Sequence, residues 1–287
     1  MKTTLSNGKI QITINHIGAE LTSLKTDDGC EYLWQSNPDY WVRQSPVLFP
    51  IVGRFEEFRY WFEDKEYEIE QHGFAKESLF ELAEKGVDKL VFRLNSNLET
   101  LKKYPFDFEF LVEYRLEENT LVNRFVVKNI GNRTMWFSIG AHPGFRCPLN
   151  IGENMTDYYL EFSENETIER GFLEDNVRTD KTELFLQNEK IVPITPELFQ
   201  RAAIILEGLR SDKVVLKSDK TKRAVTVEFP GFPYLGIWSA PGPYICIEPW
   251  YGVIGRRGDI DLKKKEGIQS LTGGRIFECQ YRIKVDG

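Results

Sequence analysis

The sequence predicts an all-β protein in which antiparallel strands pack as a sandwich. Three observations lead to this prediction: apolar and polar residues alternate with period two, aromatic residues are abundant, and helical patterns are few and short. The chain contains 20 Phe, 12 Tyr and 6 Trp, and such side chains suit a pleated, half-buried surface. With 287 residues, it has the length of one large β domain, so we expect residues 1–287 to form a single unit.

The clearest strand is the segment FDFEFLVEYRL at residues 106–116. Every second residue is apolar, from Phe106 to Leu116, and most residues between them are charged. This pattern predicts a long strand with one buried face. Turn residues at 117–119 and 129–132 separate it from two further strands at 120–128 and 134–140, which indicates an antiparallel meander.

The same rules locate the other elements along the chain. Strands are expected at 9–15, 19–26, 30–35, 88–94, 213–218, 223–229, 234–238, 244–248 and 276–285. Asp27-Asp28-Gly29 is a tight hairpin turn. Short helical patterns occur around 97–103 and 196–200, and the Pro/Gly-rich stretches at 230–243 and 252–258 are interpreted as loops.

Composition excludes several classes of partner. The net charge of −7 opposes binding to a phosphate backbone, so we expect no nucleic-acid partner. No signal peptide and no apolar run of about 20 residues is present, so we expect a cytoplasmic protein without membrane association. The four cysteines, Cys30, Cys147, Cys246 and Cys279, show no CxxC spacing and are interpreted as free thiols.

Signatures of common enzyme classes are absent from the sequence. There is no GxGxxG after a strand, no GxxxxGK[ST], no HExxH and no GxSxG, so nucleotide, zincin and α/β-hydrolase chemistry is unsupported. His72 and His142 lie seventy residues apart without ligand-like spacing, so a metal site is disfavoured. We therefore expect neither a cofactor nor a metal.

Four polar residues in apolar, turn-rich surroundings are the candidates for chemistry. They are Arg54 in FPIVGRF, His72 in EQHGFAK, His142 in SIGAHPGFRCPL and Glu248 in GPYICIEPW. His142 follows a strand-like run at an expected chain reversal, where functional groups are often positioned. Glu248 ends an apolar strand, and a carboxyl group buried there is a candidate general base.

Each candidate also has a structural interpretation. Arg54 suits a surface ion pair, His72 a solvated loop, and His142 a buried histidine bonded to backbone. The structural alternative for Glu248 is an ion pair with Arg256 or Arg257. A proton-transfer site explains imidazole and carboxyl groups together, because both exchange protons near neutral pH when their pKa values are tuned.

The motifs together resemble the aldose 1-epimerases, or mutarotases, most closely the mutarotase-related branch found beside bacterial lactose genes. The shared stretches are YLWQ at 32–35, PVLFPIVGRF at 46–55, QHGFA at 71–75, GAHPGF at 140–145 and ICIEPW at 245–250. They occur in the family's order and span most of the chain. The resemblance implies a single-domain antiparallel β-supersandwich of the galactose mutarotase type.

By this resemblance, Glu248 is the catalytic base, His142 the catalytic acid and His72 a second active-site histidine. Arg54 matches the arginine that binds sugar hydroxyls. The implied reaction removes a proton from the C1 hydroxyl of a cyclic aldose and protonates the ring oxygen. The ring opens, the C1–C2 bond rotates, and reclosure gives the other anomer without a cofactor.

Other residues are expected to shape the sugar site. Trp238 and Tyr234 are candidates for an aromatic face under the sugar, with core aromatics as the alternative. Galactose-acting members carry an acid in an Asp-His-Asn context, where this chain has LRSDKVVL with Asp212 as the local acid. The chain also has His72-Gly73-Phe74 where those enzymes have a second glycine.

Two functions therefore remain open from the sequence. The first is an aldose 1-epimerase that acts on a hexose or hexose derivative, as a monomer or homodimer. The second is a weakly catalytic or non-catalytic sugar-binding or regulatory protein on the same fold. The Glu248–His142 pair favours the enzyme, because binding alone requires no acid and base together.

Overall fold

The fold is known from a computed structural model, which describes residues 1–200, 203–240 and 242–287. It confirms the all-β prediction, because the described residues form 22 strands, one α-helix and four short 3-10 helices. The strands of the first half are β1 (Lys2–Ser6), β2 (Ile10–Asn15), β3 (Glu20–Thr26), β4 (Val47–Leu48), β5 (Arg59–Phe62), β6 (Lys65–Glu68), β7 (Glu81–Lys85), β8 (Lys89–Asn95), β9 (Phe108–Glu117), β10 (Thr120–Asn129), β11 (Met135–Phe137), β12 (Ile139–Ala141) and β13 (Gly144–Arg146).

The second half continues the pattern. Its strands are β14 (Tyr158–Glu174), β15 (Val177–Pro193), β16 (Ile204–Glu207), β17 (Lys213–Ser218), β18 (Ala224–Glu228), β19 (Tyr234–Trp238), β20 (Tyr244–Tyr251), β21 (Gln269–Leu271) and β22 (Ile276–Asp286). The helix α1 covers Leu98–Lys103, and the 3-10 helices are η1 (Glu56–Phe58), η2 (Ala75–Glu77), η3 (Met155–Asp157) and η4 (Leu262–Lys264).

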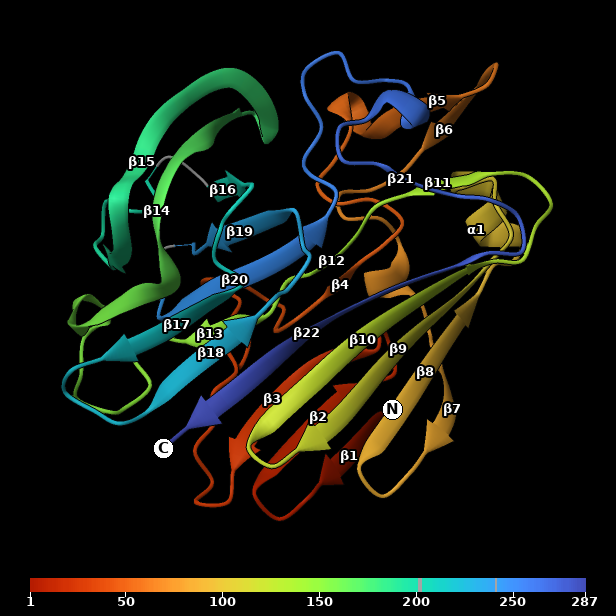
Figure 1. The fold of residues 1–287 in the computed structure, drawn as a ribbon. Coiled ribbons are helices and arrows are strands. Elements are labelled where there is room, and N and C mark those ends of the chain that lie inside the picture. Colours follow the sequence, from red (N-terminus) through yellow and green to blue (C-terminus); the bar gives the residue numbers. More distant parts are fainter. Residues whose placement is uncertain (201–202, 241) are drawn as a thin grey trace.

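One large antiparallel sheet forms the body of the molecule (Figure 1). Its path runs β4-β12-β20-β19-β16-β14-β17-β18-β22-β10-β9-β8-β7, with β13 added beside β20 and β15 beside β14. A three-stranded sheet, β1-β2-β3, shares a single hydrophobic core with β8, β9 and β10. This arrangement is a sandwich, because apolar faces of two sheets bury each other.

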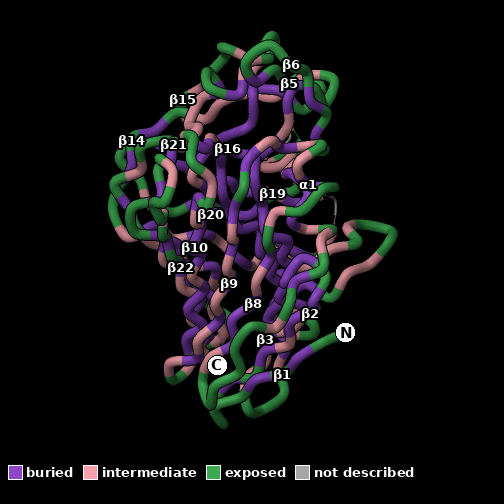
Figure 2. Tube along the Cα trace, turned by 90° about the vertical axis from the view of Figure 1, so that its right-hand side faces the viewer, coloured by how far each residue is buried: buried purple, intermediate pink, exposed green. Residues whose placement is uncertain are grey.

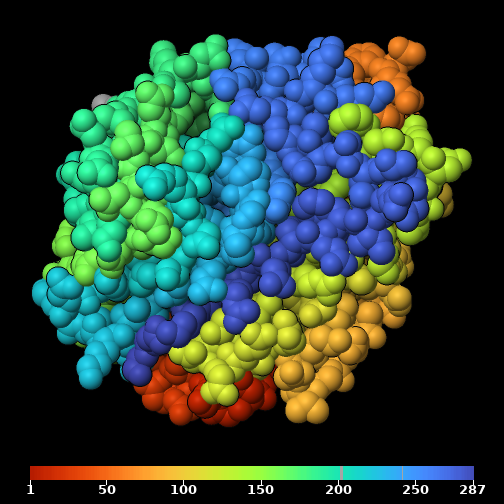
Figure 3. All heavy atoms as spheres, in the orientation of Figure 1, coloured from red at the N-terminus to blue at the C-terminus, as the bar shows by residue number. Residues whose placement is uncertain are grey.

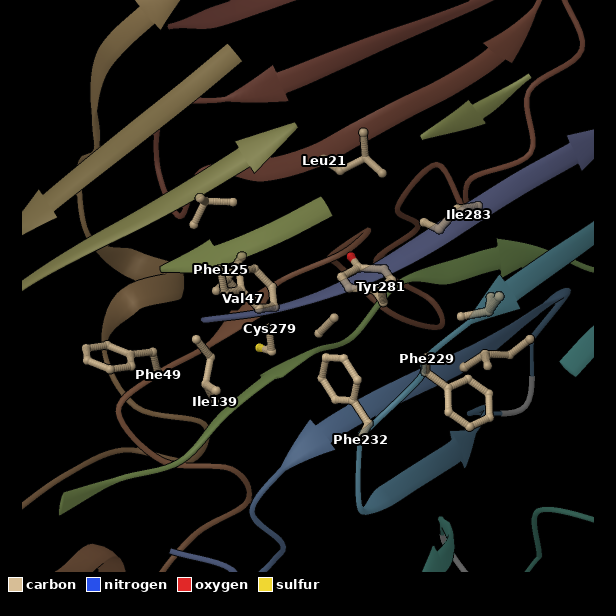
Figure 4. Close-up of a cluster of buried hydrophobic side chains, with 14 of the residues drawn as sticks. Leu21, Val47, Phe49, Phe125, Ile139, Phe229, Phe232, Cys279, Tyr281 and Ile283 are labelled. Atoms are coloured by element: carbon tan, nitrogen blue, oxygen red, sulfur yellow. The ribbon is translucent and has the colours of Figure 1, made fainter. Parts of the chain in front are cut away.

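Alternation along the strands explains which face is buried. β9 alternates strictly between buried and partly exposed residues, as the sequence predicts for 106–116. Buried segments run through the centre of the molecule and exposed segments lie in the outer loops (Figure 2). Figure 4 shows part of the core, where Phe125 and Tyr281 from paired strands lie near Leu21 of the small sheet.

Most expected elements are present, and α1 is capped as its sequence predicts. The Asn97 side chain accepts from the backbone N–H groups of Glu99 and Thr100, which satisfies free donors at the helix start. Three expectations are wrong. The segment 134–140 does not add a third strand to a meander: it divides into β11, which pairs with β21, and β12, which pairs with β4 and β20. Residues 30–35 make only isolated bridges instead of a strand, and residues 196–200 form turns instead of a helix.

The long hairpin of β14 and β15 is absent from the sequence prediction. Each strand has 17 residues, and the pairing between them is interrupted by register shifts. The first residues of β14 alternate between buried and partly exposed, but most of β15 and the end of β14 are exposed or partly exposed on both faces, so the period-two pattern fades along the hairpin. In Figure 3 the green part of the chain, which includes this hairpin, covers the left side of the molecule.

Candidate active site

His142 and Glu248 occupy matching positions on neighbouring stretches of the main sheet. β12 and β13 both pair with β20, with Gly140 opposite Trp250 and Gly144 opposite Cys246. The residue midway between the two pairs, His142, therefore lies opposite Glu248. The expected chain reversal at His142 is wrong. From β12 to β13 the chain runs antiparallel to β20 without turning back, and only His142 and Pro143 lie outside the paired strands.

Glycines beside β20 make room for large side chains on this face. A Cβ at Gly236 would lie 2.4 Å from the Trp250 ring, and one at Gly140 would lie 2.5 Å from it. Gly236 pairs with Glu248 on the opposite side from His142. Only glycine leaves enough space at these positions, so the backbone itself fixes where the Trp250 ring lies.

The two reactive side chains are in direct contact. Nε2 of His142 lies 3.3 Å from Oε2 of Glu248, and their side chains are 11% and 3% exposed. Burial raises the pKa of Glu248 well above its ordinary value, although the nearby Trp250 indole opposes this shift. Burial lowers the pKa of His142 to about 3. Burial thus favours the uncharged form of each group, a protonated carboxyl beside a neutral imidazole.

Aromatic rings enclose His142 on its other sides. Trp41 stacks on it with ring centroids 4.9 Å apart, while Trp238 lies edge-on at 5.7 Å. The His72 ring is perpendicular to it at 5.6 Å. These contacts exclude water from the imidazole and account for the depressed pKa of His142.

His72 is held by an unusual backbone conformation. Its φ of 64° lies in the left-handed region, and such strain is typical of functional sites. The Gly53 backbone N–H donates to Nδ1 of His72 at 3.1 Å, and the His72 N–H donates to the Gly53 carbonyl at 2.6 Å. Because Nδ1 accepts, a neutral His72 carries its proton on Nε2, which lies 3.2 Å from the side-chain amide of Gln71.

The dyad faces a cavity of about 510 Å³. His72, His142, Glu248, Trp238, Trp41 and Trp250 contribute to its wall. This combination of aromatic faces with a few polar groups is typical of a small-molecule site. The volume lies within the usual range of roughly 300–1,000 Å³ for such pockets.

The structure thus brings four predicted residues, Glu248, His142, His72 and Trp238, to one cavity. Arg54 lies at its edge: the guanidinium donates to the Asp175 carbonyl and lies 5.2 Å from the ring centroid of Phe58, which lines the cavity. Arg54 Nε is buried without a hydrogen-bond partner.

Tyr234 and Asp212 do not line this cavity. Tyr234 is buried in a cluster with Trp250 and Ile254, so it supports the cavity wall from behind, as the core interpretation expects. Asp212 is exposed; its carboxylate accepts from Ser163 at 3.5 Å and its carbonyl accepts from the Phe229 N–H. These local bonds hold it beside the β17–β18 hairpin and not among the sugar-site candidates.

The alternative ion pairs of Glu248 are not formed. Arg256 contacts Glu266 and Asp180. Arg257 contacts Glu56 and Asp175. The basic residues are therefore engaged elsewhere, and the carboxyl group of Glu248 has His142 as its neighbour.

Sequence reasoning missed much of the cavity wall, including Trp41, Arg43 and Lys76. The Arg43 guanidinium contacts Glu77 and Glu20, and the Lys76 ammonium donates to the Gly73 carbonyl at 3.0 Å. Burial lowers the pKa of Lys76. Lys76 directly follows the QHGFA motif at 71–75. Neither Trp41 nor Arg43 lies next to a motif that indicated the site.

Comparison with known proteins identifies the class. The sequence matches the aldose 1-epimerase family over residues 1–272. Protein LacX of Lactococcus lactis subsp. lactis is 38% identical over 264 residues, which cover 87% of each chain. The chain therefore belongs to the aldose 1-epimerase family, and its fold is the galactose mutarotase-like β-sandwich.

Solved structures agree with this assignment. The galactose mutarotase related enzyme from Lactobacillus acidophilus matches with a TM-score of 0.96 at 38% identity, covering 100% of this chain and 98% of that one. A galactose mutarotase-like protein from Lactobacillus casei ATCC 334 matches with a TM-score of 0.94 at 29% identity, covering 99% of this chain and 100% of that one. Among the described residues, no helix has the length and apolar character needed to cross a bilayer.

Proposed function

We propose that this protein is an aldose 1-epimerase that interconverts the α and β anomers of a hexose or hexose derivative. The observation that carries the proposal is the His142–Glu248 contact of 3.3 Å at the wall of a cavity of sugar size. A binding protein needs hydrogen bonds to hydroxyls, but it does not need an imidazole and a carboxyl group that share one proton.

The reaction begins with proton transfer within the pair. When a sugar enters, its hydroxyls replace solvent, and the Glu248 proton moves to Nε2 of His142. The resulting carboxylate takes the proton of the C1 hydroxyl, while the imidazolium protonates the ring oxygen. Each positioned acid or base contributes roughly 10²–10⁴-fold to such a reaction.

The other site residues orient the sugar during this exchange. His72 Nε2–H donates to a sugar oxygen, because Gly53 occupies Nδ1. Trp238 offers an aromatic face beside His142, and Arg54 at the cavity edge donates to hydroxyls. After the C1–C2 bond of the open chain rotates, the two proton transfers run in reverse and close the other anomer.

Polarimetry tests the proposal directly. Freshly dissolved α-anomers of glucose, galactose and several phosphosugars are followed with and without the protein. We expect at least one sugar to reach anomeric equilibrium faster than in buffer. If sugars bind, by calorimetry, but none equilibrates faster, the protein is a sugar-binding member of the family and the enzyme proposal fails.

Substitution of the base refines this test. Glu248→Gln should lower kcat about 10²–10⁴-fold and leave sugar binding nearly unchanged, because the amide keeps the shape but accepts no proton. Glu68→Gln, at an exposed position on β6, is the matched control and should behave as the unmodified protein does. A near-normal rate for Glu248→Gln would assign the base to another residue.

A further inference from the structure

A third potential ligand atom lies beside the acid–base pair. Cys246 lies two residues before Glu248 on β20, so both side chains are on the same face of the strand. Its Sγ lies over Gly144, where an added Cβ would be 3.3 Å from the sulfur. The ligand atoms of His142, Cys246 and Glu248 all lie within 4.8 Å of one another, and all three residues are buried.

We propose that His142, Cys246 and Glu248 bind a divalent cation of the zinc type, and that this cation inhibits the enzyme. Imidazole nitrogen, thiolate sulfur and carboxylate oxygen are the three ligand types that Zn²⁺ takes in proteins. A thiolate and a carboxylate also balance the charge of a divalent ion. The occupied site therefore carries no net charge, which suits its burial.

The geometry fits a tetrahedral ion. Bonds of about 2.0–2.3 Å place tetrahedral ligand atoms roughly 3.3–3.8 Å apart. The His142–Glu248 contact of 3.3 Å already has this separation. The sulfur of Cys246 lies within 4.8 Å of both other ligand atoms, so binding an ion requires it to move inward. His142 and Glu248 line the cavity, which gives an ion access to them and leaves the fourth position to water or a sugar hydroxyl, whereas the buried Cys246 does not line it.

Inhibition follows from the atoms that the ion occupies. The Nε2 lone pair of His142 and a carboxylate oxygen of Glu248 cannot bind a metal and exchange protons with a sugar at the same time. Mg²⁺ should be harmless, because it prefers hard oxygen ligands in octahedral geometry. This part of the inference rests on the proposed function, whereas the binding itself does not.

Metal binding is measured first, without reference to activity. The purified full chain is titrated with CoCl₂, and the near-ultraviolet thiolate-to-cobalt charge-transfer band is recorded. ZnCl₂ is then titrated by equilibrium dialysis with MgCl₂ as a competitor. We expect one ion per chain, a thiolate band, and no competition from Mg²⁺. Absence of the band in the unmodified protein overturns the site.

Variants assign the sulfur. Cys246→Ser should abolish the cobalt band and weaken Zn²⁺ binding by more than the roughly 10–100-fold that loss of an outer-shell partner costs. Cys279→Ser is the matched control, because Cys279 is a buried cysteine outside the cluster. Equal Zn²⁺ affinity in both variants would overturn the proposal. If Cys246→Ser does not fold, Cys246→Ala serves in its place.

Inhibition is measured last, by polarimetry with a sugar that the enzyme turns over. We expect Zn²⁺ to inhibit the unmodified enzyme and Cys279→Ser at equal concentrations. Cys246→Ser, measured against its own metal-free rate, should need at least tenfold more Zn²⁺ for half-inhibition. If Zn²⁺ binds through Cys246 but leaves the rate unchanged, the inhibitory role is wrong. If no sugar is turned over, the enzyme proposal fails while the binding result stands.

Discussion

His142 differs from an ordinary catalytic histidine in its protonation state. The stacked Trp41 ring and the neighbouring His72 and Trp238 rings remove water from it, so burial keeps its pKa near 3 instead of 6.5. In the proposed reaction its acid form therefore arises by transfer from Glu248, whose pKa is raised by burial. The two groups titrate as a coupled pair.

This coupling predicts the pH dependence of the reaction. Because His142 takes up no proton from solvent near pH 6.5, kcat should change by no more than about twofold between pH 7.5 and 5.5. Stopped-flow polarimetry in buffers of constant ionic strength checks this expectation. A sigmoidal fall in kcat centred near 6.5 would show that a solvent-titrated imidazole carries the reaction instead.

Among single residues, the sequence identifies the two acid–base candidates but not the charged residues that line the cavity beside them. Glu248 and His142 are predictable because each interrupts an apolar strand pattern beside proline or glycine. Arg43 and Lys76 are not, because nothing local distinguishes a cation that faces a cavity from one that faces solvent. Asp212 was predicted as a sugar-site acid from its position in the sequence. Its exposure depends on the geometry of the β17–β18 hairpin, which single-residue patterns do not predict.

At the scale of elements, β20 organises the site. Cys246, Glu248 and Trp250 alternate along one of its faces, and its two neighbours supply His142 on one side and Gly236 on the other. The Trp250 ring fills the space above Gly236 and Gly140. Strand pairing, rather than loop conformation, thus sets the distances of the catalytic groups.

A methyl group at Gly236 tests this organisation. Gly236→Ala places a Cβ about 2.4 Å from the Trp250 ring, so the ring must move toward the cavity. We expect a loss of about 1–3 kcal/mol in the free energy of unfolding, typical of overpacking, together with a lower kcat.

Urea denaturation measures the change. Gly171→Ala in β14 is the control, because no atom lies within 4 Å of the Cβ that it adds. It should leave stability unchanged or raise it slightly, since alanine restricts the unfolded chain. Equal stability of the two variants would show that Trp250 is free to relocate without cost.

Strands that alternate or that turn residues bound on both sides were predictable. β9, β10, β17 and β19 match their expected bounds within two residues. β9 and β17 alternate strictly between buried and partly exposed residues, whereas β10 and β19 are buried on most of both faces. Residues 30–35 look equally strand-like, yet the Glu31 side chain bonds the backbone N–H groups of Leu24 and Leu33 and so replaces a regular ladder there. The β14–β15 hairpin was not predicted, because burial alternates only over the first part of β14 and most of β15 is exposed.

For the molecule as a whole, the acid–base pair carries a cost in stability. Glu248 has a raised pKa in the folded state, so the stabilisation from its protonated form is complete below about pH 4.5, the ordinary value. It is lost as pH rises toward the folded-state pKa, because the unfolded chain releases the proton first. The loss amounts to about 1.4 kcal/mol per pH unit.

Glu248→Gln removes this dependence, because an amide does not titrate. Relative to the unmodified protein, the variant should gain free energy of unfolding as pH rises from 5 to 7, by up to about 1.4 kcal/mol per pH unit. Urea denaturation at the two pH values measures the difference. If the difference in unfolding free energy between the two proteins is the same at pH 5 and pH 7, the Glu248 carboxyl has the same pKa in the folded and unfolded chains.

Because His142 and Glu248 lie opposite each other on neighbouring stretches of the main sheet, the distance between them is set by different segments from those that contact the rest of a ligand. The distance between the His142 and Glu248 side chains is set by the spacing of adjacent strands. Insertions in loops do not alter this spacing. The rim that meets the rest of the ligand comes from other segments, including the stretch around Trp41 and the β14–β15 hairpin, where Leu173 faces the cavity. On the proposed function, changes in that rim would alter which sugar is bound, while the distance between His142 and Glu248 stays as it is.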